Sequence, residues 1–144
     1  MKTVITLIIL TLITCGCTTS APYSPPSGPK DLPAVFDLTG TWAGTMTGYD
    51  NGIGFNDHAG GTITLVIAEQ HGRIFAGNLT VVENGKIIFS SEVAGAVGRD
   101  GRTLTIVQES GYSTGEITGT DTLELIYVND AEQFSVAIDT LRRV

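Results

Sequence analysis

The sequence has no cysteine after position 17 and only 8 basic residues among 144. The later part of the chain therefore has no disulfide and no cysteine-based metal site. With 15 acidic residues the formal net charge is −7, which repels phosphate backbones, so nucleic acid is not expected as a partner.

Catalytic signatures are also missing. The sequence contains no Gly-x-Ser-x-Gly nucleophile elbow and no Gly-Lys-Ser or Gly-Lys-Thr phosphate loop. Its two imidazoles, His58 and His71, fall in a predicted loop and a predicted turn. We therefore expect a protein that is not an enzyme and that needs no cofactor or metal ion.

The first 16 residues have the pattern of a signal peptide. Lys2 precedes an apolar run over residues 4–13, and ten residues are too few to span a hydrocarbon core, which takes roughly 20 in a helix. Cys17 follows the small residue Gly16, a pattern that resembles the lipobox of lipoproteins. Cys15, with Leu12 three places before it, is the alternative site. This resemblance implies a protein anchored to the cell membrane by a lipid, with its domain on the extracytoplasmic face.

Residues 17–36 are expected to form a tether, because they contain all five prolines and several serines. Such sequence favours an extended, semi-rigid spacer over a paired strand. The remaining segment, residues 37–144, is long enough for one domain with one core.

That domain is predicted to be all-β. Short alternating segments are separated by turn signals such as Asn84-Gly85 and Asp100-Gly101. Strands are expected over residues 40–49, 61–69, 73–82, 86–94, 102–109, 116–119, 122–128 and 132–141. Seven or eight sequential strands predict an antiparallel up-and-down meander that closes into a barrel, with a β-sandwich as the alternative.

The expected interior face is apolar throughout. The alternation assigns to it Ile63, Leu65, Ile67, Phe75, Leu79, Ile87, Phe89, Leu104, Ile106, Leu123, Leu125, Phe134, Val136 and Ile138. Such an interior is either a dry core or a site for an apolar ligand, because a polar ligand needs buried hydrogen-bonding groups.

The longest predicted connection, residues 49–60, is the candidate recognition loop. Long loops at the end of a sheet often carry binding residues. Here they offer aromatic surface together with carboxylates and an imidazole, and the candidate ligand-binding residues are Tyr49, Asp50, Phe55, Asp57 and His58.

The run Leu38-Thr39-Gly40-Thr41-Trp42 resembles the opening of calycin barrels, the group that includes lipocalins and avidins. That resemblance implies a tryptophan closing one barrel end, covered by an arginine from near the chain end, here Arg142 or Arg143. The fuller run over residues 38–49, with residues 69–77, also resembles uncharacterised secreted lipoproteins of methanogenic archaea. This likeness implies a surface location and no known activity.

Together these features favour a cell-surface lipoprotein with a non-catalytic binding domain. Its expected partners are the membrane, through the anchor, and either an unknown surface protein or a small apolar ligand. The alternatives are a lipocalin-like carrier of an apolar ligand and a barrel-type inhibitor of exported hydrolases.

The anchor predicts a specific modification. Mass spectrometry of the membrane fraction should find a mature chain that begins at Cys17 and carries lipid on that residue. A lipid-free chain that begins beyond residue 17 would contradict the prediction.

Overall fold

The structure is a computed structural model that describes residues 35–144, so the predicted signal peptide, Cys15, Cys17 and the predicted tether up to residue 34 lie outside it. The described part confirms the all-β prediction. No helix long and apolar enough to cross a membrane is found among these residues. The nine strands are β1 (Gly40–Asp50), β2 (Gly54–Asn56), β3 (Gly61–His71), β4 (Ile74–Glu83), β5 (Lys86–Val97), β6 (Thr103–Gln108), β7 (Tyr112–Gly119), β8 (Thr122–Asn129) and β9 (Ser135–Arg143).

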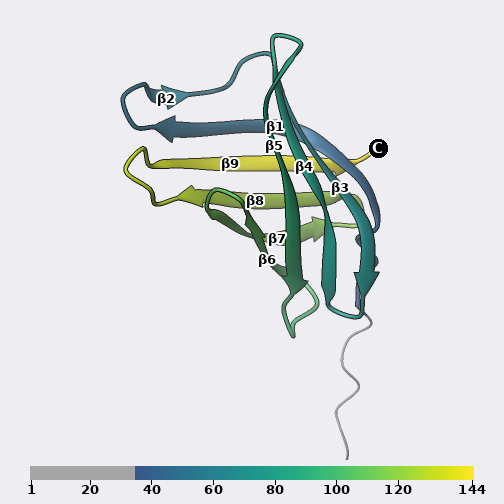
Figure 1. The fold of residues 1–144 in the computed structure, drawn as a ribbon. Helices are drawn as coiled ribbons and strands as arrows, with labels where there is room; N and C mark the ends of the chain where they lie inside the picture. Colours follow the sequence, from purple (N-terminus) through teal and green to yellow (C-terminus); the bar gives the residue numbers. More distant parts are fainter. Residues whose placement is uncertain (1–34) are drawn as a thin grey trace, which may run out of the picture. The chain divides into compact units, whose positions relative to one another are not determined.

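The strands form an antiparallel meander that closes on itself (Figure 1). Each strand from β3 to β8 pairs with the next, and β9 pairs with β1, which also pairs with β3. Eight strands thus make the closed barrel, which confirms the barrel over the sandwich. The short β2 extends the C-terminal end of β1 as a hairpin, in a segment that the sequence pattern had assigned to a loop.

Closure depends on two glycines on the inner side of β1. A Cβ atom at Gly44 would lie 1.8 Å from the carbonyl oxygen of Thr140, and one at Gly48 would lie 2.4 Å from that of Val136. Any side chain at these positions would collide with the backbone of β9. Glycine here lets the first and last strands approach closely while the sheet curves into a barrel.

The predicted hairpin turns are present. Asn84 and Gly85 both have positive φ, 50° and 74°, as a two-residue primed turn requires. The turn before β6 is held by Asp100, whose carboxylate accepts hydrogen bonds from the backbone N–H groups of Arg102 and Thr103.

One end of the barrel is closed by Trp42, which is fully buried and donates its indole N–H to the carbonyl oxygen of Leu38 (2.9 Å). The guanidinium of Arg143 lies over the indole, with its carbon 4.2 Å from the ring centroid. Arg143 also donates hydrogen bonds to the carbonyl oxygens of Asp37 and Thr39. Of the two arginines predicted to cover Trp42, the structure therefore selects Arg143. Phe36 also packs against this end of the core.

The predicted interior face is wrong in two strands. Phe134, Val136 and Ile138 were expected inside at β9. Phe134 instead precedes the strand, Val136 and Ile138 lie on its outer face, and all three side chains are 43–48% exposed. In β5, Ile87 is 68% exposed, because Ile88 has no residue opposite it in β4 and shifts the alternation. The remaining apolar positions assigned to the interior are buried or packed against the core.

Replacing Trp42 with alanine should lower the free energy of unfolding by about 3–5 kcal/mol, because the indole fills the closed end. The measurement is chemical denaturation of both proteins. Ile87→Ala, which removes an exposed side chain of the same sheet, should change stability by less than about 0.5 kcal/mol. A Trp42→Ala protein as stable as the parent would contradict the structural role assigned to the indole.

Candidate ligand-binding site

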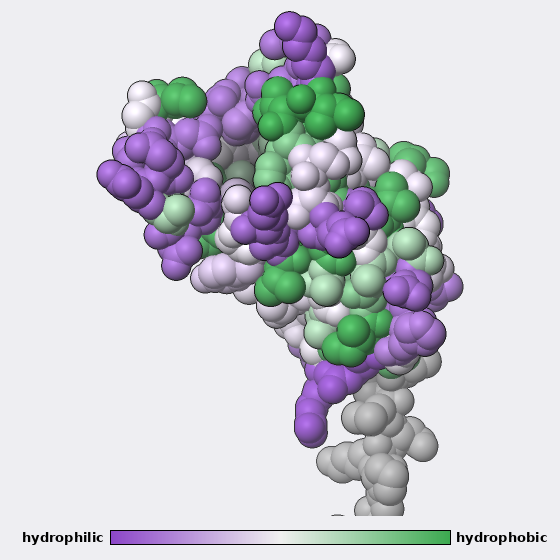
Figure 2. Space-filling model, in the orientation of Figure 1, coloured by the Kyte–Doolittle hydropathy of each residue, from purple (hydrophilic) through white to green (hydrophobic). Residues whose placement is uncertain are grey.

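A cavity of about 220 Å³ lies inside the barrel, toward the end opposite Trp42. The cavity opens beside the first half of β5, residues 86–92, which pairs with β4 on one side only. The pairing of β5 with β6 begins at Val93. Figure 2 shows a hollow between the β1–β2 hairpin and the β4–β5 hairpin. Every strand of the closed barrel contributes to the lining, which consists of Met46, Asp50, His58, Ile63, Leu79, Val81, Ile88, Phe89, Gln108, Ser113, Tyr127, Ser135, Ala137 and Asp139.

The lining is apolar on one side and polar on the other. Strands β3, β4 and β5 supply aliphatic and aromatic side chains, including Ile63, Leu79 and Phe89. Strands β6 to β9 supply Gln108, Ser113, Tyr127 and Asp139, with carbonyl, hydroxyl and carboxylate groups. An apolar wall facing a few fixed polar groups is typical of small-molecule sites.

Asp139 is the most unusual residue of the cavity, because its carboxylate is only 3% exposed. The register of β9 places it between Met46 of β1 and Leu125 of β8, so it faces the interior with them. Within residues 35–144, its Oδ1 atom has no hydrogen-bond partner. Burial raises the pKa of Asp139 to about 6, and the nearby His58 acts in the opposite direction.

Tyr127 belongs to the same group. Its hydroxyl donates a hydrogen bond of 2.7 Å to the carbonyl oxygen of Ser110. Burial raises the pKa of Tyr127, the side chain of Gln108 acts in the opposite direction, and the carboxylates of Asp139 and Asp50 add to the effect of burial. The phenol therefore remains a neutral hydrogen-bonding group at the cavity wall.

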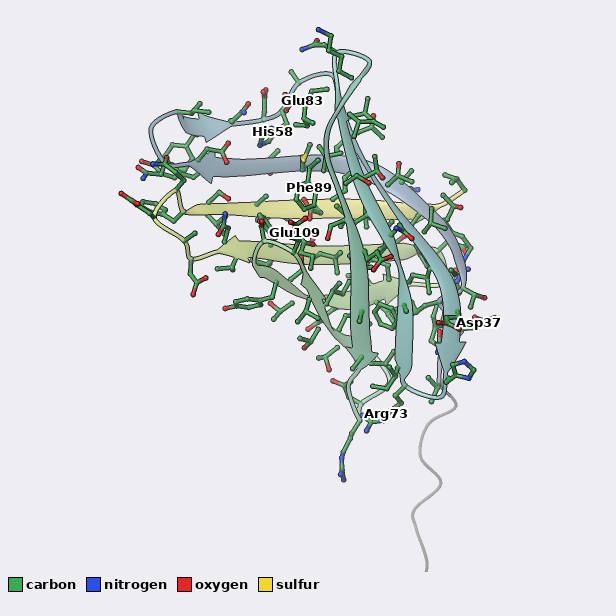
Figure 3. The ribbon with its side chains drawn as sticks, in the orientation of Figure 1. Asp37, His58, Arg73, Glu83, Phe89 and Glu109 are labelled. Atoms are coloured by element: carbon green, nitrogen blue, oxygen red, sulfur yellow. The ribbon has the colours of Figure 1, made fainter. Side chains whose placement is uncertain are left out.

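His58 joins the loop after β2 to the barrel. Its Nδ1 atom lies 2.7 Å from a carboxylate oxygen of Glu83 and its Nε2 atom lies 3.6 Å from Asp50, with the side chain 14% exposed. The backbone at His58 is left-handed, with φ 45°, and its carbonyl oxygen accepts the N–H of Gly61 (2.7 Å). Figure 3 shows His58 and Glu83 next to each other, above the interior. The imidazole thus fixes the loop at the cavity mouth.

The five residues predicted for recognition do not form one site. Asp50 and His58 line the cavity, whereas Tyr49, Phe55 and Asp57 line a shallow hollow on the outer surface. The rings of Tyr49 and Phe55 meet edge to face at 5.2 Å, and Phe55 is 93% exposed. The loop therefore divides its polar and aromatic side chains between the two faces of the sheet.

The polar wall of the cavity was not predicted from the sequence. The predicted interior side of β9 consisted of Phe134, Val136 and Ile138, which places Asp139 on the opposite face. The alternative alternation in the same strand, Ser135, Ala137, Asp139 and Leu141, would have placed a carboxylate inside. Gly44 and Gly48, four residues apart on the same face of β1, were the available signal that the neighbouring strand is closely packed there.

The outer surface carries its own apolar feature, a row that crosses five adjacent strands. Cross-strand pairing aligns Phe55 with Tyr49, Tyr49 with Val136, Val136 with Val128, and Val128 with Tyr112. Three of these side chains, Phe55, Val136 and Tyr112, are more than 40% exposed. We call this set the outer row.

Comparison with models of known protein families finds no match, and comparison with curated proteins finds none either. Among residues 35–144, no group of three or more His, Cys, Asp or Glu side chains is arranged to hold a metal ion. The fold is compatible with that of calycins, as the opening residues around Trp42 had suggested.

Burial of Asp139 gives a pH-dependent prediction for stability. Its pKa rises from 3.8 to about 6 on folding, so the folded state resists ionisation. Below about pH 3 the Asp139 carboxyl is neutral in both the folded and the unfolded state, and its burial does not lower stability. As pH rises from 4 to 6 the unfolded chain ionises first, and above pH 6 the folded protein has lost about 2–3 kcal/mol of stability.

Asp139→Asn should therefore stabilise the protein more at pH 7.5 than at pH 4, by about 2–3 kcal/mol. Denaturant unfolding at the two pH values measures the difference. Asp130→Asn, at an exposed carboxylate after β8, serves as the control and should show no comparable difference. An equal effect of Asp139→Asn at both pH values would show that Asp139 ionises freely in the fold.

Proposed function

We propose that this protein is a non-catalytic binding protein that takes a small ligand into the cavity of its barrel. The observation that supports this function is the cavity itself, which lies open at one end and is lined by an apolar wall opposite a polar wall. An apolar cavity of roughly 150 Å³ is large enough for benzene, so about 220 Å³ accommodates a compact ligand with one ring or a short alkyl chain.

The proposal includes the calycin type of barrel and a location outside the cytoplasm. The buried Trp42 beneath Arg143 supports the first, because the same pair follows from the calycin resemblance. The signal-like residues 1–16 and the lipobox-like Cys17 support the second. A lipid-anchored domain of this kind would capture its ligand at the membrane surface.

A surface protein is the second candidate partner, and the outer row favours it. Exposed aromatic and branched side chains aligned across several strands are typical of interaction surfaces. Because the outer row and the cavity lie on opposite faces of β9, substitutions in that strand separate the two functions.

The test is a screen of fragments with about 6–12 non-hydrogen atoms, a size suited to the cavity. Protein-observed NMR should show hits that shift the resonances of cavity residues. Ala137→Phe fills the cavity from β9 and should abolish binding, whereas Val136→Phe adds the same ring to the outer face and should not. Hits that survive Ala137→Phe and disappear with Val136→Phe would place recognition on the outer surface.

A further inference from the structure

Two buried hydrogen-bond acceptors line the same cavity without a donor. Within the described residues, neither Oδ1 of Asp139 nor Oε1 of Gln108 has a hydrogen-bond partner, and each atom exposes almost no surface, so a small rotation of its side chain must accompany contact with a ligand. Leaving such atoms unpaired in a low-dielectric interior costs free energy. A ligand that supplies donors to both recovers that cost, whereas a ligand that supplies only acceptors does not.

The charges around the cavity have one dominant sign. The carboxylates of Asp50 and Asp139 line it, and Glu83 contacts His58 at the mouth. No lysine or arginine is part of the lining, and His58 is the one basic side chain in it. The field in the cavity therefore favours a cation and disfavours an anion.

The apolar wall determines the rest of the ligand. Met46, Ile63, Leu79, Val81 and Phe89 present aliphatic and aromatic surface across from the two acceptors. A ligand that fits both walls has a donor group at one end and an apolar body at the other.

We propose that the cavity selects a protonated organic amine, with the ammonium directed to Asp139 and Gln108 and the apolar body against Leu79 and Phe89. This inference rests on the proposed function, and it specifies the class of ligand. An ammonium has three donors, enough for both acceptors, and its charge pairs with the carboxylate of Asp139. An alcohol of the same length has one donor, and a carboxylate has none.

The experiment compares three probes with equal chains, hexylamine, 1-hexanol and hexanoate, by calorimetry at pH 7.5. The full chain is held in lipid nanodiscs so that free detergent does not compete, and protein-free nanodiscs correct for partition into lipid. Hexylamine should bind about tenfold or more tightly than 1-hexanol, because hydrogen bonds to charged groups are stronger than those between neutral groups. Hexanoate should bind most weakly.

Asp139→Asn should remove the preference for hexylamine while 1-hexanol still binds, because the apolar wall is unchanged. Asp139→Ser provides a second variant in case the amide disturbs the fold. Asp130→Asn, which changes the net charge equally at an exposed position, should retain the preference.

The outcomes separate the two proposals. If 1-hexanol binds as tightly as hexylamine, and Ala137→Phe abolishes the binding of both, the cavity is a binding site but the amine class is wrong. Retention of the amine preference in Asp139→Asn would also overturn the inference. If none of the three probes binds, the cavity does not take ligands of this size, and the inference falls together with the proposed function.

Discussion

The contact between Arg143 and Trp42 joins the two ends of the described domain. Trp42 belongs to the first strand and Arg143 to the last, and the two residues are partners in the pairing that closes the barrel. The guanidinium covers the indole, and its hydrogen bonds to Asp37 and Thr39 hold the segment before β1. The pairing of β1 with β9 is thus stabilised by side-chain packing in addition to backbone hydrogen bonds. The barrel is held closed at the Trp42 end, so the other end of the barrel can remain open.

The barrel interior changes character along its length. Near Trp42 it is a packed apolar core, with residues such as Leu65, Leu123 and Leu141 fully buried. Toward the mouth, Asp139 and Gln108 replace apolar residues on one wall, and the packing gives way to a cavity. A buried carboxylate that costs stability at neutral pH is unexpected in a core that serves only to hold the fold. Its position supports the proposed binding function.

The sequence predicted the architecture well because its strongest signals are local. Turn residues such as Asn84-Gly85 mark the hairpins, and sequential hairpins leave few topologies open. Trp42 and its cover also followed from a short resemblance. The cavity was harder to predict, because both alternations in β9 contain apolar residues and the choice between them depends on pairing with β1 and β8. Of the five predicted recognition residues only Asp50 and His58 line the cavity, and the polar residues of β6 to β9 that line it were not predicted.

The first half of β5 has a strand partner on one edge only, and its free edge bears on the solubility of the protein. From Lys86 to Glu92 this strand pairs with β4 alone, and its pairing with β6 begins only at Val93, opposite Gln108 at the end of β6. A long, flat edge of this kind would invite another chain to add a strand and seed a fibril. The bulge at Ile88 twists the edge, and the charges of Lys86 and Glu92 stand at its two ends. The strand edge beside the cavity opening is in this way protected from becoming a template for aggregation.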